Sequence, residues 1–130
     1  EDKVIFKGKI PPAQLRAISQ QAYIGITLFD DRGKSNYYSL ANRFFDYLHA
    51  GIPQIGVNFP VYKIINDKRP IAILLDDTSA KNVASQLNNL LQNKVLYESL
   101  QQNCMEVREI FNWQIEEKKL LQFYTNLFAN

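Results

Sequence analysis

The chain has 130 residues, 46% of them hydrophobic, and its 15 basic and 13 acidic side chains give a net charge of +2. This length and apolar content suit one compact domain and leave little room for a second. The charge is too balanced for a nucleic-acid-binding surface, so we expect partners to be recognised through a defined site.

The single cysteine, Cys104, excludes an internal disulfide and indicates a reducing compartment. The longest apolar runs, such as residues 71–75, are far shorter than the roughly 20 residues that a membrane-spanning helix needs. No basic and apolar leader opens the chain, so we predict a cytoplasmic protein. The sequence starts without methionine and enters an apolar segment almost at once, which indicates a piece of a longer protein.

The first part of the chain predicts a strand, a helix, a second strand and a loop. Residues 4–6 (VIF) are a short apolar strand candidate. Residues 12–22 predict a helix with Pro12 in its first turn. The apolar stripe of this helix comprises Leu15, Ile18 and Ala22. Residues 23–29 (YIGITLF) predict the next strand, and we expect a loop over 30–38.

The next helix, predicted over residues 40–49, carries two stripes. Ser39 is suited to cap its start and Gly51 to end it. The apolar stripe, which has the spacing of a core-facing surface, comprises Leu40, Phe44, Tyr47 and Leu48. The polar stripe comprises Asn42, Asp46 and His49. Core packing explains only the apolar stripe, so the polar stripe needs another explanation.

Two further strands are predicted at residues 53–57 and 71–75, and both have the apolar character of strands buried on both faces. Three helices fill the last third of the chain: one around Val83 to Leu91, one over 94–109 and one over 113–128. We therefore predict an α/β fold, with a Rossmann-like parallel sheet covered by helices on both faces and a helical carboxy-terminal third.

A ligand site is expected at the start of the two-stripe helix, because open parallel sheets bind ligands at the carboxyl ends of their strands. The unpaired amides of the first helical turn favour a phosphate, and Ser39 and Asn42 can add hydrogen bonds. Asp46 lies about 6 Å further along the axis, where a carboxylate can accept bonds from a ribose diol. Arg43 adds positive charge. This spacing fits a nucleotide diphosphate.

Plainer interpretations of the same residues remain open. From spacing alone, an exposed ion pair between Asp46 and Arg43, worth a few tenths of a kcal/mol, is favoured. His49 is more commonly a helix-end residue than a catalyst. The acidic pairs at residues 30–31 and 76–77 each follow a strand and precede a turn, where aspartate is common for backbone reasons. We interpret both pairs as loop contacts and expect no metal site.

The order of four segments resembles the carboxy-terminal half of the group 1 glycosyltransferases, which use nucleotide sugars and have the GT-B fold. The segments are VIFKGKIPPAQL, AYIGITLF, SLANRFFDYLHAGIPQIG and FNWQIEEKKLLQFYTNLF. The third segment is the most specific, with Ala41 in place of proline, Arg43 in place of lysine and Asp46 in place of glutamate. The resemblance implies a single donor-binding domain over 1–130, part of a longer two-domain hexosyltransferase that retains anomeric configuration.

The resemblance also implies roles for individual residues. Asp46 matches the acidic residue that binds the donor ribose, beside the positive charge of Arg43. The loop that lies against the nucleotide base is matched by Gly8, Lys9 and Ile10. The diphosphate-binding turn is matched by Ser39, Leu40 and Asn42. Tyr38 stands where the family has a glutamate that contacts the donor sugar, so the identity of that sugar stays open.

The partners implied are the nucleotide-sugar donor, an unknown glycan or lipid-linked acceptor of polysaccharide biosynthesis, and an amino-terminal acceptor-binding domain that can bring the protein to a membrane surface. No cofactor is implied besides the donor substrate. The family's upstream arginine and lysine, which neutralise the leaving diphosphate, have no counterpart before Val4. Because transfer needs donor, acceptor and charge stabilisation together, we predict that these residues alone bind but do not catalyse.

Two alternatives belong to other functional classes. A phospho-signalling receiver is also a doubly wound domain, but it needs an acidic pair after its first strand and an aspartate after its third, whereas the pairs here follow the second and fourth predicted strands. The other alternative is a non-catalytic interaction domain of the same fold. The resemblance further predicts that the helix at 113–128 is less well packed than the others, because in the family it reaches toward the other domain.

Overall fold

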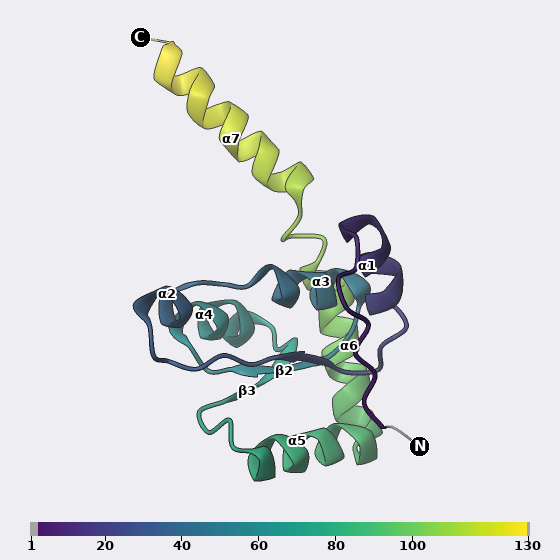
Figure 1. Cartoon of the computed structure of the whole chain (residues 1–130). Coiled ribbons are helices and arrows are strands. Elements are labelled where there is room, and N and C mark those ends of the chain that lie inside the picture. Colours follow the sequence, from purple (N-terminus) through teal and green to yellow (C-terminus); the bar gives the residue numbers. More distant parts are fainter. Residues whose placement is uncertain (1–2, 130) are drawn as a thin grey trace.

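The computed structural model describes residues 3–129 (Figure 1). Its elements in chain order are α1 (Pro12–Ser19), β1 (Gly25–Thr27), α2 (Lys34–Tyr38), α3 (Asn42–Ala50), β2 (Gln54–Val57), α4 (Pro60–Lys68), β3 (Ala72–Leu75), α5 (Ala80–Gln92), α6 (Lys94–Val107) and α7 (Trp113–Phe128). The predicted α/β class and the helical carboxy-terminal third are confirmed.

The strands form a three-stranded parallel sheet in the order β1-β2-β3. Gly25 pairs with Gln54, and Gln54 pairs with Ala72. Every residue of the central strand β2 is buried, as its continuous apolar character predicts. The predicted strands at 23–29, 53–57 and 71–75 therefore exist and run parallel, although each is shorter than its apolar segment.

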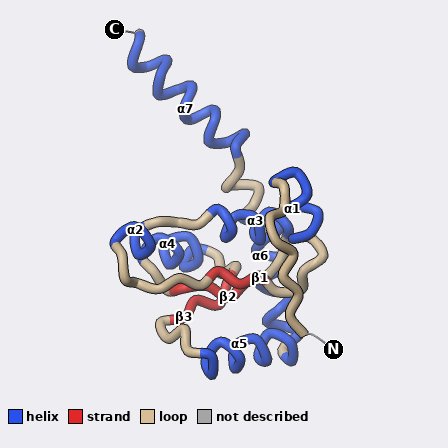
Figure 2. Tube along the Cα trace, viewed as in Figure 1, coloured by secondary structure: helices blue, strands red, loops and turns tan. Residues whose placement is uncertain are grey.

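Two apolar clusters show that helices cover both faces of the sheet (Figure 2). The cluster beneath α3 and α4 comprises Phe44, Leu48, Val57, Tyr62, Ile65, Ile71, Ala72, Cys104 and Val107. The cluster beneath α5 comprises Ile55, Leu75, Leu90 and Leu100. Helix α6 contributes to both clusters and contacts both α3 and α5. It therefore joins the two layers at one end of the sheet.

Helix α3 packs through the predicted apolar stripe, with Phe44 and Leu48 fully buried. Gly51 ends the helix with a φ of 73°, which glycine adopts without strain. On the sheet side, Gly25 allows close approach, because a Cβ atom there would lie only 2.4 Å from the ring of Tyr47. These contacts fix the polar stripe of α3 on the side away from the sheet.

The predicted strand at residues 4–6 is wrong. The segment has no regular structure, and Val4, Ile5 and Phe6 are 65%, 77% and 93% exposed. A strand needs a neighbour for its backbone hydrogen bonds, and within residues 3–129 this segment pairs with none. The helix at 12–22 is confirmed with Pro12 in its first turn, but it ends at Ser19, so Ala22 lies beyond its stripe.

Two short helices were not predicted. The expected loop at 30–38 contains α2, whose residues are polar or aromatic and show no apolar period. Helix α4 begins at Pro60, a favourable first-turn residue, and buries Tyr62 and Ile65. In a segment this short, those two side chains do not distinguish a helix from a loop without knowledge of the sheet they cover.

The three carboxy-terminal helices are confirmed, and each begins with a side-chain cap, from Ser79, Asn93 and Asn112 respectively. Helix α7 projects away from the rest of the chain (Figure 1) and buries none of its residues. The prediction that it is less well packed than the helix near residues 80–91 is confirmed, since that helix buries Leu90. Within the described residues, no helix combines the length and apolar character needed to cross a membrane.

Candidate functional site

The start of α3 presents backbone amides at the carboxyl edge of the sheet. The N–H of Ala41 donates to the Tyr62 hydroxyl at 3.0 Å, and the N–H of Phe44 donates to the Ala41 carbonyl at 3.0 Å. Within residues 3–129, the amides of Asn42 and Arg43 have no acceptor. Two adjacent donors at the positive end of a helix are suited to bind an anionic group.

Ser39 does not cap α3, which corrects that prediction. Ala41 occupies the cap position and offers no side-chain hydrogen bond. Ser39 instead ends α2, where its N–H donates to the Ser35 carbonyl at 3.1 Å and its hydroxyl to the Asn36 carbonyl at 3.4 Å. Ser39 therefore caps the end of α2 and not the start of α3, to which the sequence pattern assigned it.

The polar stripe of α3 separates two open grooves. The polar groove, of about 540 Å³, is lined by Arg16, Asp46, His49, Arg108, Glu109, Asn112, Trp113 and Gln114. The apolar groove, of about 700 Å³, is lined by Leu40, Asn42, Phe45, His49, Ile65, Phe111, Asn112, Trp113 and Glu116. All three residues of the stripe therefore line a groove, and His49 lines both. Asn42 is exposed, whereas Asp46 and His49 are partly buried.

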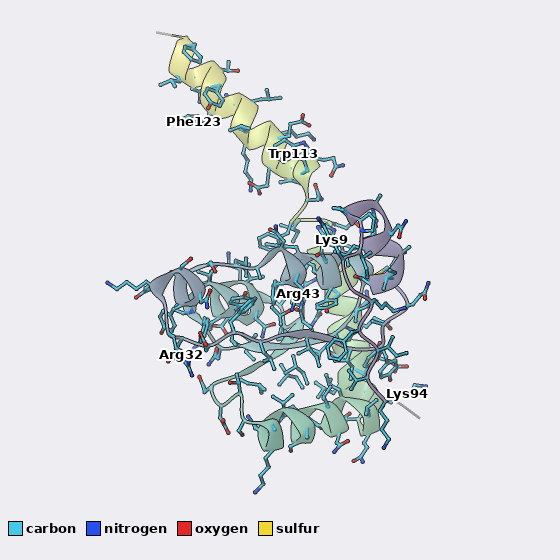
Figure 3. All side chains as sticks on the ribbon, viewed as in Figure 1. Lys9, Arg32, Arg43, Lys94, Trp113 and Phe123 are labelled. Atoms are coloured by element: carbon cyan, nitrogen blue, oxygen red, sulfur yellow. The ribbon has the colours of Figure 1, made fainter. Side chains whose placement is uncertain are left out.

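The expected ion pair between Arg43 and Asp46 is also wrong, because none joins these side chains within the described residues. Asp46 is partly buried and faces the polar groove, while Arg43 is exposed on α3 (Figure 3). Arg16 reaches the groove from α1, which packs against α3. Asp46 therefore shares the groove with two arginines, neither of which pairs with it.

The other predicted site residues are not brought together in one groove. Leu40 and Asn42 line the apolar groove, whereas Asp46 lines the polar groove. Neither groove is lined by Gly8, Lys9, Ile10, Tyr38, Ser39 or Arg43. The loop at 8–10 is largely exposed and leads directly into α1, with Gly8 at a φ of 65°. Tyr38 is 62% exposed at the end of α2.

The far wall of both grooves is the junction between α6 and α7, which sequence reasoning did not find. Asn112 holds this junction: its amide donates to the carbonyls of Arg108 and Glu109 at 3.3 and 2.9 Å, and its oxygen accepts from the Ile115 N–H at 3.0 Å. Trp113, next to it, is 62% exposed. No local pattern links this junction to α3, more than sixty positions earlier in the chain.

Three residues of the two acidic pairs, Asp30, Asp76 and Asp77, make the loop contacts expected of them. The Asp30 carboxylate accepts from the Arg32 N–H at 3.4 Å, and Asp76 accepts from the Asn58 side chain at 2.9 Å. Asp77 accepts from the N–H and hydroxyl of Ser79 at 2.8 and 2.7 Å, and these hydrogen bonds lower its pKa. The part of the chain that the structure describes contains no cluster of three potential metal ligands.

Cys104 lies in the core rather than in a site. Its thiol approaches the carbonyls of Ile52 and Ile71, each at 3.7 Å, and burial raises its pKa to about 12. A buried thiol of this kind is not a nucleophile at neutral pH.

Comparisons with protein-family models, with curated proteins and with solved structures found no match for this chain. The function is therefore inferred from the geometry of α3 and its grooves together with the sequence resemblance.

Proposed function

We propose that this chain is the nucleotide-sugar donor-binding domain of a glycosyltransferase, and that the donor lies along the polar stripe of α3. The observation that carries the proposal is the position of Asp46. Its carboxylate is partly buried, lines a groove and forms no ion pair within residues 3–129. It follows, by about one helical turn, the amides of Asn42 and Arg43, which have no acceptor among the described residues.

This arrangement matches the parts of a nucleoside diphosphate in order. The diphosphate binds at the start of α3, where the amides of Asn42 and Arg43 and the positive helix end favour an anion. The ribose lies about 6 Å further along, where the carboxylate of Asp46 accepts hydrogen bonds from its hydroxyls. The loop at 8–10, ahead of α1, is assigned to the nucleotide base by the resemblance alone, since it lines neither groove.

The strand order is compatible with the proposal. A doubly wound sheet of six strands has the order 3-2-1-4-5-6, in which the last three are consecutive neighbours. The observed order β1-β2-β3 fits these last three strands. The apolar segment at 4–6 would then be the third strand, separated from β1 by two strands from an upstream part of the parent enzyme. This accounts for its exposure here, and the parent would also supply the acceptor-binding half and the activity.

The test compares the nucleotide affinity of the Asp46→Ala variant with that of the unaltered chain, measured by calorimetric titration with UDP and GDP. Loss of charge-assisted bonds to the ribose should weaken binding by about 1.5 to 3 kcal/mol, while the free energy of unfolding changes little. Asp67→Ala is the matched control, because Asp67 is exposed on α4 and lines neither groove. If Asp46→Ala binds a nucleotide as tightly as the unaltered chain does, the stripe is not the donor site.

In the observed sheet the acidic pairs follow the first and third strands, which are the positions at which a receiver carries its aspartates. Receivers have the strand order 2-1-3-4-5, which makes strands 1 and 3 neighbours and brings their aspartates together. Here β2 lies between β1 and β3, so β1 and β3 do not correspond to strands 1 and 3 of a receiver. Magnesium-dependent labelling by acetyl phosphate would favour a receiver, and absence of any nucleotide binding would favour a non-catalytic interaction domain.

A further inference from the structure

The polar groove extends beyond Asp46 toward the carboxyl end of α3. His49 follows Asp46 by three residues, about 4.5 Å along the helix axis, and lines the same groove. In the proposed pose the diphosphate occupies the opposite end of the helix. A ribose held at Asp46 therefore directs its base into the part of the groove bordered by α1 and the α6–α7 junction.

The side chains around this part of the groove have a distinctive chemistry. Two guanidinium groups, from Arg16 and Arg108, and one carboxylate, from Glu109, face the same space. Their hydrogen-bonding capacity is largely unused within residues 3–129. In the described part of the chain the Arg16 side chain forms no ion pair or hydrogen bond, and the Arg108 side chain contacts only Oε1 of Glu109, through Nε at 3.3 Å. The terminal amino groups of Arg108 and the second oxygen of Glu109 remain available to a ligand.

Guanine is the base that best matches these groups. Its O6 and N7 atoms are adjacent acceptors, which arginine binds in bidentate fashion, and its N1–H and N2 amino group are adjacent donors, which suit a carboxylate. Adenine has an amino group where guanine has O6, and uracil has no pair of adjacent donors. Trp113, exposed beside these side chains, offers an aromatic surface on which a base can stack.

We infer that the polar groove is a guanine-recognition site, so that the donor is a GDP-sugar rather than a UDP-sugar or an ADP-sugar. Arg16 and Arg108 bind the O6 and N7 edge, and Glu109 accepts from N1–H and the N2 amino group. This inference rests on the proposed function, since it takes the position of the ribose from Asp46.

The first measurement is the affinity of the chain for GDP, UDP, ADP and inosine 5′-diphosphate, which lacks the N2 amino group. One bidentate contact to the correct base makes binding of GDP about tenfold or more tighter than binding of UDP or ADP. Inosine diphosphate should bind between these limits, because it keeps O6, N7 and N1–H. UDP binding as tightly as GDP would overturn the inference.

Two substitutions identify the residues that recognise the base. Glu109→Gln should weaken the binding of GDP more than the binding of inosine diphosphate, because only GDP has the amino group that faces the carboxylate. Arg16→Gln should lower the affinity for GDP by about tenfold and leave the affinity for UDP almost unchanged. The matched controls are Glu98→Gln on α6 and Arg32→Gln on the loop before α2. Arg32 lies far from Trp113, which lines the groove (Figure 3).

The outcomes separate this inference from the function on which it rests. If Arg16→Gln lowers the affinities for GDP and UDP by the same factor, Arg16 binds a phosphate. Its role in base recognition is then wrong, although the proposed donor site stands. The same conclusion follows if Glu109→Gln affects GDP and inosine diphosphate equally. If none of the nucleotides binds, the proposed function fails together with the inference. Melting curves of each variant verify that its fold is intact.

Discussion

At the scale of single residues, Gln54 fixes the candidate site over the sheet. Its side chain lies in β2 and is fully buried. The side-chain amide donates to the Phe44 carbonyl of α3 at 3.0 Å, and the side-chain oxygen accepts from the Thr27 hydroxyl of β1 at 3.1 Å. Because Phe44 lies between Asn42 and Asp46, this pair of hydrogen bonds sets the position of the polar stripe relative to both strands.

Replacement of Gln54 should therefore destabilise the fold through unpaired polar groups. Gln54→Leu leaves the Thr27 hydroxyl without its acceptor in the core, at a cost of about 1 to 3 kcal/mol in the free energy of unfolding. Urea denaturation measures the loss. The double variant with Thr27→Val should lose less than the sum of the single variants, because it removes both members of the hydrogen bond. Simple additivity would show that the bond contributes nothing.

The sequence predicts the polar residues of α3 but not the residues that face them. Asn42, Asp46 and His49 are recognisable because one helix repeats its spacing within a few positions. Arg16 from α1 and Trp113 from α7 both line the polar groove, at positions with no periodic relation to α3. Ser39 shows the opposite error, since its local pattern fits a cap, but the preceding helix ends on it.

At the scale of elements, the prediction succeeds where local pattern and tertiary partner agree. The three observed strands are apolar and each has a neighbouring strand. Residues 4–6 are equally apolar but have no neighbour within the described part of the chain, so they remain irregular. Helix α4 shows that a sheet face can impose a helix where only Pro60 and two buried side chains favour one.

Helix α7 is the element with the least tertiary support, since it spans 16 residues and buries none of them. Isolated helices of roughly this length are marginal in water. We expect the backbone amides of α7 to exchange with solvent far faster than those of α6, which buries Tyr97, Leu100, Cys104 and Val107. Hydrogen exchange read by mass spectrometry tests this. Protection of α7 equal to that of α6 would mean that a partner or a second copy covers it in solution.

At the scale of the whole molecule, α6 joins the two apolar clusters into one cooperative unit. It contributes Leu100 to the cluster under α5, and Cys104 and Val107 to the cluster under α3 and α4. Unfolding of either face therefore exposes part of the other through the same helix. Cys104 lies at the centre of this connection, next to the chain segments that precede β2 and β3.

Ionisation of Cys104 should consequently make the stability of the whole chain fall at alkaline pH. Burial raises its pKa from 9.0 to about 12, so above pH 9 the unfolded chain loses a proton that the folded chain keeps. The free energy of unfolding then decreases with rising pH, by up to about 1.4 kcal/mol per pH unit from this one group. Below pH 9 the thiol is protonated in both states and adds no pH dependence.

Urea denaturation of the unaltered chain and of the Cys104→Ala variant, each from about pH 8 to 11, measures this slope. The contribution of the other titrating groups is common to both proteins, so the difference between the two slopes belongs to Cys104. Cys104→Ala should start less stable because it loses a core side chain, yet it should decline less steeply. Equal slopes for the two proteins would show that the thiol ionises in the folded state as easily as in the unfolded one.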